Sequence, residues 1–282
     1  MSPAAPVSTR LLEGLPLRAL TAAAGVASRW NTPTMLRRPL FGAFARATGA
    51  DLSEAADPPE HFATFEEFFL RELRDGARAW QTPEDAIAMP SDGRLDALGV
   101  VEEGRMIQAK GIDYAAQDLL AGEASADALE GARYATIYLA PADYHRVHVP
   151  TTARWVSATH VGGALRPVNG LSVPYVPALF CTNERVVCTF ELPDGQRLWV
   201  VLVGATVVGR ILIDHAEYVS LDVRTLGQLR TALSGEVAPG DPLGGFGLGS
   251  TVIIVAERGA GWSEAASAGV TCRVGTPLFL RA

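Results

Sequence analysis

Short runs of apolar and β-branched residues follow one another along the chain after residue 85, separated by Gly, Pro and Asp-Gly turns. Runs of this length that are rich in Val, Ile, Thr and Tyr are typical of strands in antiparallel sheets. Asp194-Gly195 lies between two such runs and predicts a hairpin turn. The segment 113–132 predicts one short helix. The predicted strands cover residues 133–139, 146–149, 185–192, 197–203, 206–213 and 251–256.

The first 75 residues carry a helical pattern instead. Leu36, Leu40, Phe41 and Phe44 recur at helical spacing, and Gly49 provides a stop. An earlier group of leucines predicts another helix, broken or kinked near Pro16; its members are Leu11, Leu12, Leu15 and Leu20.

A third helix is predicted after Thr64, because Thr64-Phe-Glu-Glu67 has the sequence of a capping box. Its buried stripe is expected to consist of Phe65, Phe68, Phe69 and Leu73. These patterns together predict an α+β fold, in which N-terminal amphipathic helices precede a β-rich, largely antiparallel body. We place the boundary so that a helical region covers residues 1–75 and a β-rich domain covers residues 76–282.

The charge is spread unevenly between these two parts. The chain carries a net charge of −7, yet residues 1–50 hold six Arg and one acidic residue, which leaves −12 for the remainder. A basic, amphipathic N-terminus is typical of contact with an anionic membrane surface, although an ordinary helix packed on the body would have a similar pattern. The acidic balance argues against nucleic acid as a partner. The three cysteines form no CxxC motif and fit a reducing compartment.

Two of the five histidines, His145 and His148, lie three residues apart in one segment. Histidine is the usual acid–base residue near neutral pH. In a strand this spacing places two side chains on opposite faces, so the rings share a pocket only if the backbone bends between them. No third residue nearby has the spacing of a metal ligand, so we expect no metal. The alternative is a pair of buried, hydrogen-bonded histidines.

Two other short motifs carry residues with catalytic chemistry. Asp92, in Ser91-Asp-Gly93, is by itself a turn residue, and it becomes functional only if the fold brings it to a histidine. Ser250 lies between a glycine-rich stretch and an apolar strand, in the sequence Leu248-Gly-Ser-Thr251. No helix is expected after this serine, which excludes a dinucleotide-binding loop and the nucleophile elbow of hydrolases.

Taken together, these segments resemble phosphatidylserine decarboxylase, a pyruvoyl-dependent enzyme of the prokaryotic, proenzyme type. Lys110, the only lysine of the chain, falls at the Lys-Gly position of that family. The matching stretches occur in the family's order and are Phe68-Phe-Leu-Arg-Glu-Leu73, Ser91-Asp-Gly93, Gln108-Ala-Lys-Gly111, Tyr138-Leu-Ala-Pro-Ala-Asp-Tyr-His-Arg-Val-His148, Asn183-Glu-Arg-Val186, Val203-Gly-Ala205 and Leu248-Gly-Ser-Thr251.

The resemblance implies that the chain cuts itself between Gly249 and Ser250, giving associated pieces 1–249 and 250–282. Ser250 would become a covalent pyruvoyl group, which serves as the cofactor in place of pyridoxal phosphate or a metal. Asp92, His148 and Ser250 would form the self-cleavage triad. His145 would bind substrate and transfer a proton during decarboxylation.

The implied reaction converts phosphatidylserine into phosphatidylethanolamine and CO2 through a Schiff base with the pyruvoyl group, in phospholipid biosynthesis. The β-rich domain 76–282 would be catalytic, and region 1–75 would associate with the membrane. The implied enzyme is a homodimer and a peripheral protein on the cytoplasmic face of the cell membrane. Its partners are the phospholipid substrate and the anionic membrane surface.

Three other interpretations remain open from the sequence. A pyruvoyl decarboxylase could act on another serine phospholipid or on a soluble amino acid. A serine hydrolase could use Ser250, His148 and Asp92 without self-cleavage. A non-enzymatic lipid-binding protein could carry the Gly-Ser step merely as a turn.

Overall fold

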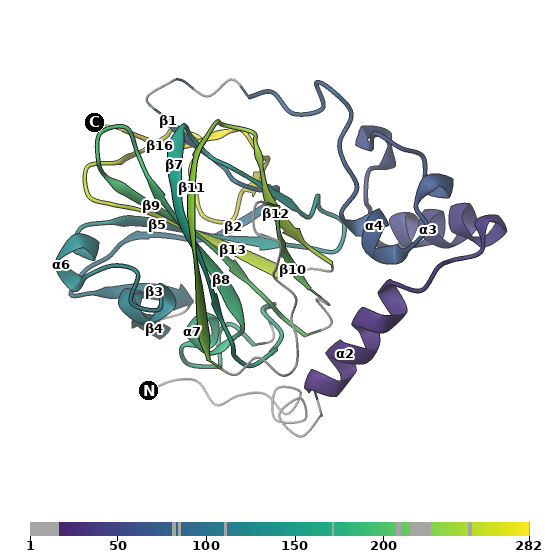
Figure 1. Cartoon of the computed structure of the whole chain (residues 1–282), viewed down its shortest axis with the longest axis horizontal. Helices are drawn as coiled ribbons and strands as arrows, with labels where there is room; N and C mark the ends of the chain where they lie inside the picture. The colour runs from purple at the N-terminus through teal and green to yellow at the C-terminus, as the bar shows by residue number, and fades with distance from the viewer. Residues whose placement is uncertain are drawn as a thin grey trace.

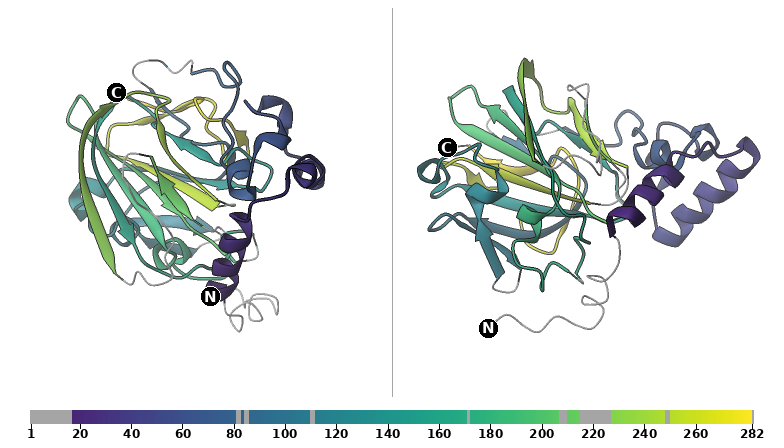
Figure 2. Two further views of the ribbon diagram at one scale, coloured as in Figure 1. Left: turned by 45° about the vertical axis from the view of Figure 1, so that its right-hand side comes forward. Right: turned by 60° about the horizontal axis from the view of Figure 1, so that its bottom comes forward.

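The N-terminal helices lie on one side of a large β body (Figures 1 and 2). This arrangement comes from a computed structural model of the chain. The structure describes residues 17–80, 83, 86–109, 112–170, 172–206, 210–214, 227–247 and 250–281.

An eight-stranded sheet forms the centre of the body, and every pairing between its strands is antiparallel. Strand β13 occupies an interior position between β9 and β5. From one edge to the other the strands are β11 (Gln228–Val237), β7 (Ala153–Val161), β8 (Arg185–Glu191), β9 (Arg197–Val203), β13 (Ser250–Ala256), β5 (Arg133–Leu139), β2 (Gly93–Val100) and β15 (Thr271–Cys272).

Three smaller sheets and three short helices complete the body. One sheet has the order β10 (Ile211–Ile213), β12 (Pro242–Phe246) and β6 (Arg146–His148). Another has the order β1 (Ala86–Ala88), β16 (Pro277–Leu280) and β14 (Gly261–Trp262), and β3 (Arg105–Ala109) pairs with β4 (Ile112–Ala115). The short helices are α5 (Ala116–Leu119), α6 (Ala126–Leu129) and α7 (Leu179–Thr182).

The core follows from unbroken apolar runs in the central strands. All seven residues of β13 are buried, and so are six of the seven in β9. Strands buried on both faces read as continuous rather than alternating hydrophobic patterns. Trp155 and Trp199 add the largest buried side chains of the main core.

The sequence predicted four neighbouring strands of the large sheet, β8, β9, β13 and β5, but it missed the interior strands β7 and β2 as well as both edge strands. The predicted ranges 133–139 and 197–203 coincide with β5 and β9, and Gly195 turns between β8 and β9 with a φ of +84°. The predicted strand 206–213 is confirmed only at 211–213, and residues 207–209 lie outside the described part. The single helix predicted over 113–132 is wrong, because α5 and α6 are separate turns and the segment begins inside β4.

The helical region consists of α2 (Leu17–Ser28), α3 (Thr34–Thr48) and α4 (Phe65–Phe69), with 3₁₀ turns at Leu52–Glu54 and Pro59–His61. Gly49 ends α3 as predicted, in the left-handed conformation, and its N–H donates to the Ala45 carbonyl at 2.8 Å. The leucines predicted at positions 11, 12 and 15 lie outside the described residues. None of the helices within the described ranges is both long and apolar enough to cross a bilayer.

A cluster of aromatic rings joins α3 to α4, apart from the main core. Phe41 and Phe68 are fully buried and stack with ring centroids 5.0 Å apart. The cap of α4 forms as predicted at Thr64, whose hydroxyl accepts the Glu67 N–H at 3.1 Å. The Glu67 carboxylate reaches back to the N–H of Ala63, at 2.7 Å, one residue before the position that a capping box uses.

The predicted length of this third helix is wrong, since α4 ends at Phe69. Leu73 therefore lies beyond the helix, where its backbone forms an isolated bridge with Ala55. The stripe that α4 buries is thus shorter than the sequence indicates, and residues 70–80 form an irregular connection with turns toward the β body.

Gly93 offers a test of how tightly β2 packs on β5. Its φ is +147°, and an added Cβ would lie 2.5 Å from the carbonyl oxygen of Tyr138. We expect Gly93→Ala to lower the free energy of unfolding by about 3 kcal/mol, because backbone strain and the clash add together. Gly195→Ala is the matched control, since its added Cβ meets nothing within 4 Å. That control should lose only about 1 kcal/mol, and equal losses in urea denaturation would contradict the packing argument.

Candidate active site

The histidine segment is held in place by the connection that follows α4. The ring of Phe69 packs against the ring of His145, with centroids 4.7 Å apart. Arg71 is only 4% exposed and donates to the carbonyls of Ala142 and Asp143, both at 3.4 Å. The helical region is therefore a structural support for the residues that the sequence analysis singled out.

His145 is completely buried, and its ring is oriented by one hydrogen bond. Its Nδ1 donates to the Asp143 carbonyl at 2.8 Å, which leaves Nε2 as the unprotonated nitrogen of a neutral ring. Nε2 has no hydrogen-bond partner among the described residues. Burial lowers the pKa of His145 to about 3, against the opposing effect of the Asp143 carbonyl and with help from the charge of Arg71. The ring is thus neutral at physiological pH.

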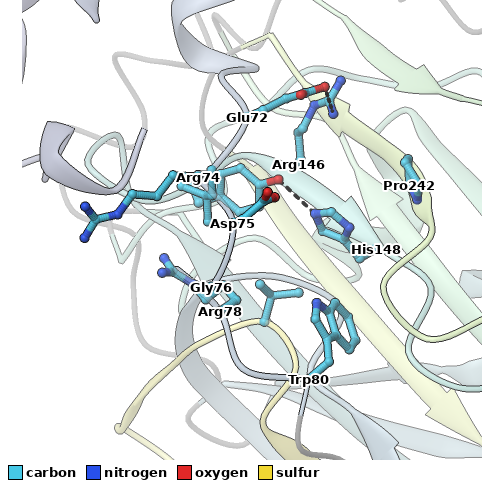
Figure 3. A pocket seen from close by; sticks show the side chains of 12 residues that line it. Glu72, Arg74, Asp75, Gly76, Arg78, Trp80, Arg146, His148 and Pro242 are labelled. Atoms are coloured by element: carbon cyan, nitrogen blue, oxygen red, sulfur yellow. Dashed lines mark hydrogen bonds and ion pairs between the residues drawn. The ribbon is translucent and has the colours of Figure 1, made fainter. Parts of the chain in front are cut away.

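His148 lies in a different environment, beside a cavity of about 340 Å³. Figure 3 shows Arg146 and Glu72 at one end of this cavity, Trp80 at the other, and His148 between them. The His148 Nδ1 donates to the Gly240 carbonyl at 2.9 Å, and its Nε2 accepts from the Tyr144 hydroxyl at 2.8 Å. Burial lowers the pKa of His148, although the Gly240 bond partly opposes this effect.

The two histidines lie in different surroundings. Strand β6 begins at Arg146, directly after His145, and in extended backbone side chains three residues apart point to opposite faces. His148 lines the larger cavity with Arg146, whereas His145 packs on Phe69 and is not among the residues that line this cavity.

Asp92 is buried but does not contact His148. Its carboxylate pairs with the guanidinium of Arg78 through two hydrogen bonds, one of them 3.1 Å long, and accepts the Val274 N–H at 2.8 Å. Arg78 also pairs with Glu54, at 3.0 Å. Asp92 lines a second cavity of about 150 Å³, which shares the walls Arg78 and Tyr144 with the larger one. The structure therefore separates two members of the expected triad.

Ser250 is the first residue of β13 and is completely buried. Its hydroxyl finds no hydrogen-bond partner in the part of the chain that the structure describes. Ser250 pairs with Leu139, while the Phe246 N–H donates to the His145 carbonyl at 3.1 Å. Leu139 therefore lies beside Ser250, and His145 lies beside Phe246. These two contacts place Ser250 at the same end of the body as His145. Gly249 and Lys110 lie outside the described residues.

Three residues of the site were missed by the sequence analysis. Arg71 and Tyr144 lie inside motifs that were quoted, but their side chains contact backbone groups or a ring that sequence spacing does not reveal. Nothing in the sequence marked Arg78 as a site residue except its position shortly after the helix that became α4. No group of three or more His, Cys, Asp or Glu side chains within the described ranges is arranged to hold a metal ion.

Comparison with known proteins covers almost the whole chain. A family model described as Phosphatidylserine decarboxylase matches residues 65–279. A phosphatidylserine decarboxylase proenzyme of Anaeromyxobacter sp. (strain K) is 43% identical over 268 residues, which are 94% of each chain. Proteins with the same name from Aliivibrio salmonicida (strain LFI1238) and Myxococcus xanthus (strain DK1622) are 40% and 35% identical, over 275 and 267 residues. These matches cover 93% and 94% of this chain and 94% and 95% of theirs.

The buried state of His145 predicts a pH-dependent stability. The folded chain keeps this ring neutral down to a pKa of about 3, whereas the unfolded chain takes up a proton near 6.5. The contribution of His145 is therefore fully present above pH 6.5 and is lost as the pH falls toward 3, by about 1.4 kcal/mol per pH unit. The free energy of unfolding should fall more steeply between pH 6 and 5 for the parent chain than for His145→Gln.

The matched control is His61→Gln, since the His61 side chain is 62% exposed. This variant also removes one histidine, but it opens no buried site, so its curve should depart from the parent curve less than the curve of His145→Gln does. A constant difference for His145→Gln would contradict the burial argument.

Proposed function

Because the chain belongs to the phosphatidylserine decarboxylase family, we propose that it converts phosphatidylserine into phosphatidylethanolamine and CO2. The observation that carries this proposal is the place of Ser250 in Leu248-Gly-Ser-Thr251, at the buried start of a central strand. The family match extends over both histidines and Asp92 as well.

The proenzyme cuts itself between Gly249 and Ser250. The Ser250 Oγ adds to the Gly249 carbonyl carbon, the peptide C–N bond breaks, and the freed amine takes a proton, which leaves an ester. Elimination of the ester releases the Gly249 carboxylate and a dehydroalanine, which takes up water and loses ammonia to give a pyruvoyl group. The Ser250 hydroxyl has no hydrogen-bond partner among the described residues, and this supports the role because no bond to them has to break before the attack.

The two pieces, 1–249 and 250–282, stay together after the cut. Strand β13 of the smaller piece pairs along its length with β5 and β9 of the larger piece. The smaller piece also supplies β15, which pairs with β2, and β16, which pairs with β1. None of these ladders depends on the peptide bond that is cut.

The residues around position 250 fit a pyruvoyl group. Bound there, this group supplies an electrophilic carbonyl that takes up the substrate amine and accepts the electron pair left by CO2. The chain contributes a fixed position, through the pairing of residue 250 with Leu139, and burial that excludes water. A rigid, dry position of this kind favours the chemistry, because a mobile chain end would be hydrated.

The histidines have separate roles in this proposal. His148 takes the Ser250 proton during self-cleavage, and the negative charge of Asp92 raises the pKa of His148. A direct bond between these two residues would require Asp92 to leave Arg78. His145 moves a proton at Nε2 during decarboxylation. This role is supported by the buried Nε2, which has no hydrogen-bond partner within the described part of the chain and belongs to a ring that the Asp143 carbonyl orients.

The helical region 1–75 meets the membrane, and the domain 76–282 carries the chemistry. In Figure 2, α2 and α3 project away from the β body. Helix α3 exposes Met35, Leu36 and Leu40, and the connection before it exposes Trp30. These side chains lie next to several arginines in the sequence, a combination suited to an anionic lipid surface. We place this contact on the cytoplasmic face of the cell membrane, while the homodimer stays a prediction from the resemblance.

Self-cleavage is tested by the intact mass of the purified chain. We expect two pieces that separate after Gly249, the smaller one lacking a free amino terminus. Ser250→Ala should give one uncut chain, because the attacking oxygen is gone. Ser263→Ala is the control and should still be cut. A single full-length chain from a fresh preparation with Ser250 intact would favour a hydrolase or a lipid-binding protein instead.

Decarboxylation is tested separately by replacing His145. We expect His145→Gln to be cut normally but to release CO2 from phosphatidylserine vesicles at least about 100-fold more slowly, since a positioned proton donor contributes about that much. His61→Gln should release CO2 at the parent rate. Failure of His145→Gln to be cut would move His145 into the processing step.

A further inference from the structure

The Tyr144 hydroxyl is hydrogen-bonded to Nε2 of His148, which is the nitrogen that would take up a proton if His148 acts as a base. We propose that Tyr144 is a positioning residue which, together with the Gly240 carbonyl, fixes the tautomer of His148 and sets the pH range in which the chain cuts itself. This inference rests on the proposed role of His148 in self-cleavage. In a catalytic triad a carboxylate holds the histidine in the correct tautomer and orientation. Here we assign that task to the Tyr144 hydroxyl and the Gly240 carbonyl.

The two hydrogen bonds of His148 determine which of its ring nitrogens carries the proton of the neutral ring. A carbonyl oxygen only accepts, so the bond from Nδ1 to Gly240 requires a proton on Nδ1. Nε2 then carries the lone pair of the neutral ring and accepts from the Tyr144 hydroxyl at 2.8 Å. Burial raises the pKa of Tyr144 well above its usual value, so the phenol keeps the proton that it donates. His148 is therefore held with its basic nitrogen toward Tyr144.

Ring contacts fix the imidazole as well. The Tyr144 and His148 rings stack with centroids 5.7 Å apart and an interplanar angle of 22°. Trp80 contacts the same imidazole edge-on, at 5.9 Å. These contacts restrain the direction of Nε2, so the hydroxyl of Tyr144 is the first group that Ser250 must replace at this nitrogen.

Asp92 does not orient His148 in this arrangement. Both of its oxygens accept hydrogen bonds from other groups, Arg78 and the Val274 N–H. Of the two cavities, His148 lines the larger and Asp92 the smaller, and Tyr144 lines both together with Leu73 and Arg78. Tyr144 is thus part of the wall that the two cavities share, and Asp92 acts on His148 by its charge.

Several other charges face His148, and all of them remain when only the Tyr144 hydroxyl is removed. Arg146 lies two residues before His148 on β6 and lowers its pKa, while Asp214 and Asp92 raise it. The remaining charged walls of the larger cavity are Glu72, Arg74, Asp75 and Arg78. Because these groups are unchanged in Tyr144→Phe, a shift in that variant reports the hydroxyl itself.

The expected shift has a definite sign. The Tyr144 hydroxyl can bond to either form of His148, because it donates to the bare Nε2 of the neutral ring and accepts from the Nε2–H of the protonated ring. The second bond is charge-assisted and stronger, so Tyr144→Phe should lower the pKa of His148 by about half to one unit. Self-cleavage needs the neutral ring, so the acid limb of its pH profile should move to lower pH by the same amount.

The first measurement follows the His148 imidazole directly by NMR titration of the uncut Ser250→Ala chain, with and without Tyr144→Phe. His148→Gln assigns the signal. The second follows the cutting of newly synthesised chains with Ser250 intact between pH 5.5 and 8.5. Tyr175→Phe is the matched control, because it removes a phenol oxygen elsewhere in the body, and it should leave both curves unchanged.

Parallel shifts of the titration and of the cleavage profile support the proposal. An unmoved His148 titration overturns it and leaves the proposed function intact. A shifted titration with an unmoved cleavage profile also overturns it, and in addition removes His148 from the role of base. An uncut chain with Ser250 intact at every pH would instead count against the proposed function.

Discussion

The pairing of β13 with β5 and β9 is the constraint on which the rest of the structure depends. This strand is buried throughout and lies inside the largest sheet, so its first residue is fixed by the ladder with β5 and directly precedes the ladder with β9, which begins at Thr251. Ser250 is that first residue. The pairing of β13 with β5 and β9 runs from residue 250 onward, so it does not depend on the peptide bond before this residue. The self-cleavage that we propose would therefore leave the strand in place.

The helical region is coupled to this strand through the histidine segment. Arg71 and Phe69 hold the turn before His145, and the His145 carbonyl in turn accepts the Phe246 N–H at the end of β12. Gly245 lies so close to Leu70 that an added Cβ would come within 2.7 Å of its side chain. The region that we propose meets lipid is therefore in direct contact with the segment that holds His145.

The sequence predicted those parts of the fold that depend on local pattern. Strands β5 and β9 are continuous apolar runs, and their bounds were found correctly. Strand β11 was missed because almost all of its residues are exposed, so no hydrophobic alternation marks it. In the site, Asp92, His145, His148 and Ser250 were chosen from motifs, but their partners were not. The pairing of Asp92 with Arg78 and of Tyr144 with His148 depends on how loops pack, and spacing along the chain does not encode it.

The electrostatics of the buried end of the body follow from the same packing. Burial and the charge of Arg71 both disfavour a positive His145, so the ring is a weak base at neutral pH. The same two effects make it a strong acid once Nε2 does receive a proton, because release of that proton restores the neutral ring. A group with this character gives a proton to carbon more readily than an exposed histidine would. The charged network of Glu54, Arg78 and Asp92 lies instead along the smaller cavity, where carboxylates and guanidinium groups satisfy each other. Separation of the two environments lets one fold hold a neutral, water-free position for residue 250 while it keeps its ion pairs intact.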